Sequence, residues 1–162
     1  MAEKLDVQGP GAVSVLKGHA LRLHIDIGHL AEPPEGRRRV RTPDTAHLRK
    51  AGPLLAAAWF TLCGEDVSWP LEPCRYDLLV SGADGIRRIQ VKTTTVRAGD
   101  SWKAYLSTTR GQRRPYDPDE IDEFFVIDPD MTYYLIPVAS VGGLHAIHLS
   151  AYQEHRLPHL GS

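Results

Sequence analysis

Three polar residues that could do chemistry stand on two segments whose composition predicts a β-hairpin. Asp77 lies on the first segment, residues 76–81, and Gln90 and Lys92 lie on the second, residues 86–96. A carboxylate and an amide oxygen are ligands of the kind that Mg²⁺ takes, with water and phosphate oxygens at its remaining positions. A neighbouring ammonium could position or deprotonate a water, or stabilise charge on a phosphorane-like transition state. Together, the three residues would suit phosphodiester hydrolysis.

The register of the hairpin decides whether these residues meet. Residues 82–85 contain two glycines and form a short turn, and a turn centred on its middle pair places Ser81 opposite Ile86 and Asp77 opposite Gln90. One face would then carry Asp77, Gln90 and Lys92. The reverse face would be apolar and pack on a helix, with Tyr76, Leu78, Val80, Ile89 and Val91. A solvated sheet surface often looks the same, so spacing alone leaves a structural interpretation open.

The segments around the hairpin predict a mixed sheet with a helix against it. Residues 53–62 are apolar nearly all round and precede Gly64, which indicates a buried helix ending there. The sequence Thr42-Pro43-Asp44 suits a helix start, with Thr42 as the capping residue and Pro43 at the first helical position, and the Gly-Pro pair at 52–53 should interrupt or restart that helix. Further strands are expected at 102–109, 124–127 and 133–138, followed by a strand and a short helix over 147–155.

The first forty residues differ from the rest of the chain. Residues 1–20 contain several glycines and little periodicity, so we expect a loosely ordered start. Residues 21–27 alternate apolar and polar side chains, the period of a half-buried strand, and residues 37–41 form a basic arm. The sequence therefore predicts an N-terminal extension over residues 1–42 and a folded domain over residues 43–162.

Composition and targeting signals limit the class of protein. The chain has 162 residues, of which 42% are hydrophobic and 24% charged, as in an ordinary soluble domain. No apolar run approaches the roughly 18 residues of a membrane span, and no leader pattern is present. The two cysteines, Cys63 and Cys74, provide no disulfide framework. We therefore expect a cytoplasmic protein without a membrane partner.

The net charge of −1 hides an uneven distribution. Residues 37–114 contain fifteen Lys and Arg against seven Asp and Glu, net +8, whereas residues 115–162 contain one against eight, net −7. The basic block indicates nucleic-acid contact around Asp77, with the acidic tail turned away. The same charge distribution would also arise if the two blocks folded back on each other and neutralised each other locally. The basic residues expected to contact DNA phosphates are Arg37, Arg38, Arg39, Arg75, Arg88, Arg110, Arg113 and Arg114.

The hairpin resembles the PD-(D/E)xK nuclease motif in the variant where Gln replaces the second acid. It reads Tyr76-Asp77-Leu78-Leu79-Val80, a turn, and Ile89-Gln90-Val91-Lys92-Thr93. The chain is similar to the small homing endonucleases of bacterial group I introns and their relatives over roughly residues 50–155. The resemblance implies an α+β fold of the α/β/α type, a restriction-endonuclease-like mixed β-sheet flanked by helices.

The resemblance also implies an activity and roles for the matching residues. The protein would be a metal-dependent endonuclease that hydrolyses double-stranded DNA with Mg²⁺ or Mn²⁺. Asp77 and Gln90 would hold the metal, and Lys92 would assist the attacking water. Relatives cut both strands by assembling more than one copy, so the resemblance also suggests a homo-oligomer.

One departure from the family pattern keeps two other functions open. The family usually places a Glu on the first core helix, but no acid lies between Asp44 and Glu65. Because Gln90 is neutral, Asp77 would be the only anionic ligand unless Glu72 or Asp44 substitutes. The chain could therefore be a catalytically degenerate relative that binds DNA or forms oligomers. In a different class, it could be a protein-interaction domain that contacts a partner through its acidic tail.

Overall fold

The chain consists of two units, Met1–Thr42 and Pro43–Ser162. The computed structural model describes residues 10–26, 42–107 and 114–159. Within these ranges, no helix is long and apolar enough to cross a membrane. Cys63 and Cys74 are both free and exposed.

The first unit contains a helix where the sequence predicted a loose start and a strand. This helix, α1, spans Pro10–Arg22, so both predictions are wrong for the described residues. Leu21, Leu23 and Ile25 are 68%, 68% and 55% exposed. Alternating apolar and polar side chains stabilise a strand only when it pairs with a neighbouring strand. No described residue of this unit forms a strand that could be that neighbour. The hydrogen bonds of a helix are local, and a proline suits the first helical position.

The second unit is built on a five-stranded sheet in the order β1-β2-β3-β6-β7. Its strands are β1 (Asp66–Ser68), β2 (Leu78–Gly82), β3 (Gly85–Thr93), β6 (Glu123–Ile127) and β7 (Tyr133–Pro137). β3 and β6 are parallel and the other neighbours are antiparallel, so the sheet is mixed. The strands predicted at 124–127 and 133–138 are confirmed as β6 and β7.

A smaller sheet in the order β4-β5-β8 lies beside the first. Its strands are β4 (Arg97–Ala98), β5 (Ser101–Tyr105) and β8 (Ala146–His148). β5 is shorter than the strand predicted over 102–109, whose last two residues lie outside the described ranges. The predicted strand and short helix at 147–155 are confirmed as β8 and the 3₁₀ helix η5 (Leu149–His155).

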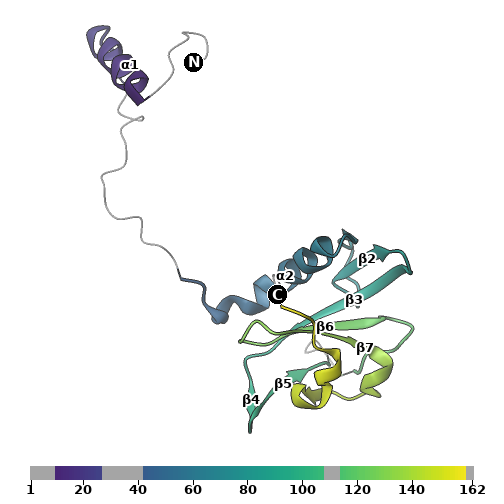
Figure 1. Ribbon diagram of the computed structural model, residues 1–162. Helices are drawn as coiled ribbons and strands as arrows, with labels where there is room; N and C mark the ends of the chain where they lie inside the picture. The colour runs from purple at the N-terminus through teal and green to yellow at the C-terminus, as the bar shows by residue number, and fades with distance from the viewer. Residues whose placement is uncertain (1–9, 27–41, 108–113, 160–162) are drawn as a thin grey trace. The chain divides into compact units, whose positions relative to one another are not determined.

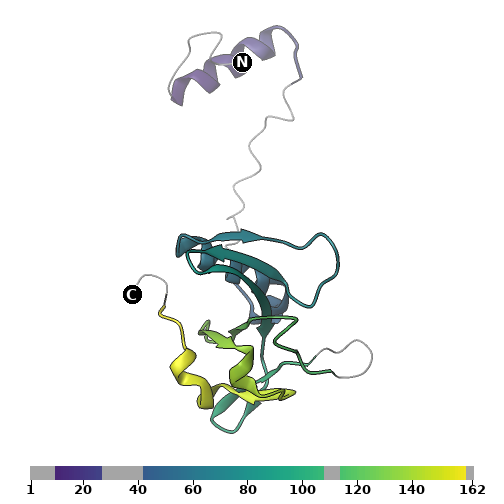
Figure 2. The ribbon, with the colours of Figure 1, turned by 90° about the vertical axis from the view of Figure 1, so that its right-hand side faces the viewer.

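The main sheet is covered on both faces (Figures 1 and 2). Helix α2 (Leu48–Leu62) packs on one face, and the small sheet packs on the other with η5 and a second 3₁₀ helix, η4 (Val138–Val141). In β6, Phe124 and Val126 join the core on one side, and Phe125 and Ile127 join the core on the other. Burial on both faces explains this apolar run. The expected α+β architecture, a mixed sheet flanked by helices, is therefore confirmed.

Helix α2 is amphipathic rather than buried all round. Its buried residues recur at every fourth position and line one face: Leu48, Gly52, Ala56 and Phe60. Leu54 and Leu62 are 64% and 71% exposed, so the prediction of an entirely buried helix is wrong. The apolar composition concealed the direction of packing, because only the stripe that meets the sheet is covered. The helix ends as predicted before Gly64, whose φ of 82° is left-handed.

The start of this helix also differs from the sequence prediction. Asp44, not Thr42, is the capping residue: its carboxylate accepts a hydrogen bond from the Ala46 backbone N–H at 2.8 Å. The cap opens a 3₁₀ turn, η3 (Thr45–His47), and α2 then continues without interruption through Pro53. Packing of the α2 stripe on the sheet outweighs the one hydrogen bond that a proline cannot donate. A Cβ on Gly52 would lie 2.6 Å from Thr93 Cγ2, so α2 approaches β3 closely here.

The hairpin of β2 and β3 has the register predicted from the sequence. Ser81 lies opposite Ile86 and Leu78 opposite Ile89, across a turn in which Gly85 has a φ of 106°. Four of the five residues expected on the helix-facing side pack there: Leu78, Val80, Ile89 and Val91. Tyr76 packs against the opposite core because β2 begins only at Leu78, so strand alternation does not reach it.

Candidate functional site

The site begins at Asp77, the residue directly before β2, where the pairing with β3 continues by one more hydrogen bond. Its N–H donates to the Ile89 carbonyl at 2.8 Å. Its carboxylate oxygen Oδ2 accepts a hydrogen bond from the Val91 N–H, also at 2.8 Å, and another from Gln90 Nε2. The Asp77 carboxylate therefore completes the ladder at the point where the backbone of β2 leaves it. The predicted meeting of Asp77 and Gln90 is confirmed.

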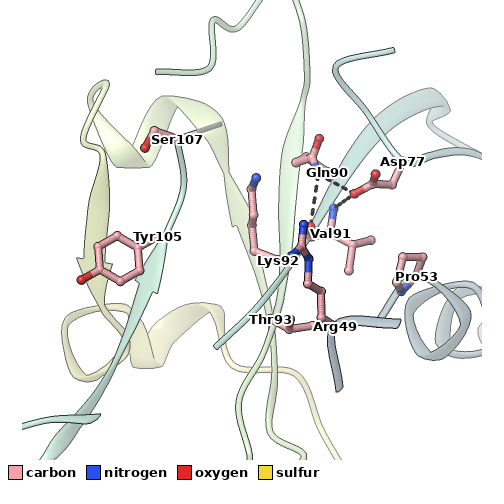
Figure 3. A pocket seen from close by; sticks show the side chains of 9 residues that line it. All are labelled: Arg49, Pro53, Asp77, Gln90, Val91, Lys92, Thr93, Tyr105 and Ser107. Carbon is pink, nitrogen blue, oxygen red and sulfur yellow. Dashed lines mark hydrogen bonds between the residues drawn. The ribbon is translucent and has the colours of Figure 1, made fainter. Parts of the chain in front are cut away.

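The site lies in a pocket of about 370 Å³ between α2, the hairpin and the β5 side of the small sheet. The residues that line it are Arg49, Pro53, Asp77, Gln90, Val91, Lys92, Thr93, Tyr105 and Ser107. In Figure 3, Asp77 and Gln90 lie together on one side of the pocket, and the Arg49 side chain extends from α2 towards Val91 and Lys92. The pocket therefore brings together the three residues that the sequence singled out.

Burial sets the charge state of the acid in this pocket. Removal from water raises the pKa of Asp77, and the Val91 N–H and the nearby Lys92 ammonium partly offset that rise. Gln90 is buried, and its Nε2 contacts both Asp77 Oδ2 and the Val91 carbonyl, the latter at 3.1 Å. Asp77 is thus a carboxylate whose charge is costly until a cation compensates it.

Lys92 is also held in a buried environment. Its Nζ donates to the Tyr116 hydroxyl at 3.1 Å and lies 4.8 Å from the centre of the Tyr116 ring. Burial lowers the pKa of Lys92 to about 8; Asp77 opposes this shift, and Arg75 and Arg49 add to it. Near neutral pH, a fraction of Lys92 is therefore unprotonated and able to accept a proton. Tyr116 supplies a partner that the sequence analysis did not single out.

The oxygen donors in the pocket fit a hard divalent cation. Gln90 Nε2 reaches Asp77 Oδ2 and the Val91 carbonyl at once, so one small group can contact both oxygens. A rotation of the Gln90 amide by half a turn would put Oε1 in the place of Nε2. Gln90 Oε1, Asp77 Oδ2 and the Val91 carbonyl oxygen would then lie close together as three possible ligands. Such a set suits Mg²⁺ or Mn²⁺, with its remaining positions taken by water or phosphate.

The negative charge available to such a cation is small. Among the described residues, no group of three His, Cys, Asp or Glu side chains is placed to hold a metal. α2 carries no acid, and the Asp44 carboxylate caps η3. Glu72 lines a neighbouring pocket that Asp77 also lines, but it does not line the pocket that contains Gln90 and Lys92. Asp77 is therefore the anionic member of the three-oxygen set.

The acidic tail does not turn away from the basic block. Four arginines form ion pairs with acids of the tail or with Glu65, and we call them the paired set: Arg75, Arg87, Arg88 and Arg114. Arg88 makes a two-pronged contact with Asp122 at 3.0 and 2.8 Å. The expectation that the tail faces away is wrong, because opposite charges on β3 and on residues 117–123 neutralise each other locally.

The predicted DNA-binding residues therefore fall into two groups. Arg75, Arg88 and Arg114 belong to the paired set, and the contact with DNA that the sequence analysis expected of them is untested. The remaining residues lie outside the described ranges: Arg37, Arg38, Arg39, Arg110 and Arg113.

The sequence analysis missed Arg49, which lines the pocket beside Asp77. Arg49 lies one turn before Pro53 on α2, and both side chains reach the pocket, as expected for residues four apart on a helix. A helical phase fixed by the buried stripe could have placed Arg49 at the edge of the sheet. The sequence alone did not reveal that phase, because the helix was read as apolar all round.

Comparisons with known proteins agree with this geometry. The family model of the PD-(D/E)XK endonucleases matches residues 51–157. Among solved structures, the chain is similar to the bacterial homing endonuclease I-Ssp6803I, with a TM-score of 0.56 and 21% identity over 66% of this chain and 78% of that one. At this identity the likeness concerns the fold, which is restriction-endonuclease-like as expected. A comparison with curated proteins finds no match.

Proposed function

Because the chain belongs to the PD-(D/E)XK endonuclease family, we propose that it hydrolyses phosphodiester bonds of double-stranded DNA with the help of a divalent metal. The observation that carries the proposal is the meeting of Asp77, Gln90 and Lys92 in one pocket. The apolar side chains of the hairpin set the strand register that brings these three residues together. Burial of three polar groups in that register costs folding free energy. Such a cost is typical of functional sites.

The proposed roles follow from the chemistry of each group. Asp77, Gln90 and the Val91 carbonyl would hold Mg²⁺ or Mn²⁺, which supplies Lewis acidity towards a phosphate oxygen. Lys92 would take a proton from the attacking water or hold that water in line with the phosphorus. Its pKa of about 8 suits the first role, since a useful base has a pKa near the working pH. Tyr116 would hold the Lys92 amine in a fixed position beside the pocket.

A cleavage assay tests this function directly. Supercoiled plasmid and linear duplex would be incubated with Mg²⁺ or Mn²⁺ and with the wild type, Lys92→Ala or Lys50→Ala. Lys50 is exposed on the same helix as Arg49 and does not line the pocket, so Lys50→Ala is the matched control. We expect metal-dependent cleavage that survives in Lys50→Ala and disappears in Lys92→Ala. Equal cleavage by both variants would rule out the role of Lys92.

The small negative charge at Asp77 favours a second candidate, a degenerate nuclease fold that binds DNA without cutting it. In the cleavage assay this module would show salt-sensitive binding and no products with either metal. If the chain neither binds nor cuts DNA, the remaining hypothesis is the protein-interaction domain. Self-association into a homo-oligomer and a cytoplasmic location stay predictions, and sedimentation of the free protein and of its DNA complex measures the first.

A further inference from the structure

The pocket holds more positive than negative charge on its walls. Its charged residues are Arg49, Asp77 and Lys92, two cations against one carboxylate. Lys92 makes its hydrogen bond to the uncharged Tyr116. Arg49 has no ion pair with any residue that the structure describes, in contrast to the paired set. Before a metal arrives, this pocket therefore suits an anion better than a cation.

The fold fixes where the Arg49 charge is presented. Arg49 stands in the first turn of α2, and Gly52 holds the following turn close against Thr93 of β3. In Figure 3 the guanidinium extends from the helix towards Val91 and Lys92, and the Arg49 charge adds to the lowering of the pKa of Lys92. Arg49 is exposed, so its guanidinium can form hydrogen bonds to a ligand without disturbing the core. A phosphate in the pocket would lie within reach of both cations.

We propose that Arg49 is a phosphodiester-binding residue that seats the DNA backbone in this pocket without any metal. The inference rests on the proposed function for the identity of its ligand, and it adds an order of events. A guanidinium matches two phosphate oxygens at once, which a point charge does not. The seated phosphate then supplies the oxygens and negative charge that Asp77 alone lacks, so the metal binds to the complex with DNA better than to the free protein.

Binding measured in EDTA tests this inference without any need for catalysis. Fluorescence anisotropy of a labelled duplex would be recorded over a range of salt concentrations for the wild type, Arg49→Ala, Arg49→Lys and Lys50→Ala. We expect Arg49→Ala to weaken binding about tenfold and to reduce the slope of log K against log salt by about 0.9, the value for one phosphate contact. Arg49→Lys should restore the slope but only part of the affinity, and Lys50→Ala should match the wild type more closely than Arg49→Ala does.

The outcomes separate this inference from the proposed function. If the wild type never cuts DNA but Arg49→Ala loses affinity and slope in EDTA, the phosphate site stands and catalysis fails. If the wild type cuts with Mg²⁺ but Arg49→Ala binds in EDTA as the wild type does, the inference fails and the function stands. A wild type that binds DNA only with metal present also overturns it. Thermal unfolding of each variant checks that an effect on binding does not come from loss of the fold.

Discussion

Two groups of cations in this protein come from the same basic stretch of sequence and have opposite surroundings. The paired set forms ion pairs with the acidic residues 117–123 or with Glu65, so acids of the same chain neutralise its charge. Arg49 and Lys92, which we call the pocket set, line the same pocket as Asp77 and form no ion pair within the described ranges. The difference teaches that a count of charges along a sequence does not measure what a ligand meets. The paired set should govern stability, and the pocket set should govern binding and chemistry.

The largest expected effect separates chemistry from stability at Lys92. Lys92→Met keeps the length of the side chain and removes the amine. We expect cleavage to fall at least about a hundredfold, the usual contribution of a general acid or base. The melting temperature should stay the same or rise, since burial disfavours the charged form of Lys92. Initial cleavage rates and thermal unfolding of the same preparations measure both. Cleavage retained by Lys92→Met would place Lys92 with the structural cations.

The next effect is the reverse case, an arginine of the paired set that acts on stability. Arg88 bonds Asp122 twice and also donates to the carbonyls of Pro118 at 3.0 Å and of Asp119. We expect Arg88→Ala to lower the free energy of unfolding by about 1–2 kcal/mol, a moderate value because solvent reaches this contact. Urea unfolding would measure it, with Lys50→Ala as the control. A stable Arg88→Ala that binds DNA poorly would move Arg88 into the pocket set.

A smaller effect is the opposite pH dependence of two adjacent acids in the tail. The Arg88 guanidinium lowers the pKa of Asp122, so its contribution to stability is present above the unfolded pKa of about 3.9 and is lost as pH falls through the folded pKa. Burial raises the pKa of Glu123, and Arg87 only partly offsets this. Stability from Glu123 should therefore increase as pH falls from neutral through its raised pKa.

Urea unfolding between pH 7 and pH 3 would compare Asp122→Asn and Glu123→Gln with the wild type. The wild type should begin to lose its advantage over Asp122→Asn towards the acidic end, as the unfolded chain takes up a proton at Asp122 more readily than the folded chain does. Against Glu123→Gln, the wild type should gain as the solution becomes acidic. Solvent screening limits the Asp122 effect to about 1 kcal/mol, since the side chains of the Arg88 and Asp122 pair are 31% and 37% exposed. Parallel curves for the two variants would contradict the assignment.

The smallest expected effect concerns Arg75, which lies close to the pocket but belongs to the paired set. Its guanidinium bonds Glu120 at 3.1 Å and the Pro115 carbonyl at 3.0 Å, and it stacks on Tyr116. We expect Arg75→Ala to change DNA affinity in EDTA by no more than about twofold, with an unchanged salt slope. Anisotropy beside Arg49→Ala provides the comparison. A loss of slope in Arg75→Ala equal to that in Arg49→Ala would erase the distinction between the two sets.

The sequence was sufficient for those parts of the fold in which local signals agree. The glycine turn at residues 82–85 and the apolar alternation beside it fixed the hairpin register, and with it the meeting of Asp77 and Gln90. A slip of one residue would have put polar groups into the α2 core, so few alternatives compete. β6 and β7 were equally predictable, because they are short apolar runs joined by a turn.

The remaining features depend on contacts between distant segments. The ion pairs that Arg75, Arg87 and Arg88 form with the tail join residues more than thirty positions apart, and a charge pattern cannot distinguish pairing from repulsion before the sheet forms. The position of Arg49 at the pocket depends on the rotation of α2 about its axis. Only the buried stripe through Gly52 and Ala56 reveals that rotation. The alternation in residues 21–27 indicated a strand, but a strand needs a partner that the described part of the N-terminal unit does not supply.

The contact of Gly52 with Thr93 gives a glycine control over the width of the pocket. Thr93 lines the pocket and is β-branched, so its methyl group has few rotamers into which it could withdraw. A methyl group at position 52 would therefore push α2 outward, together with Arg49 and Pro53, or turn Thr93 into the space meant for a ligand. Clearance for the proposed DNA backbone is thus set by a residue with no side chain, and a change there would alter what the pocket admits without removing any of its polar groups.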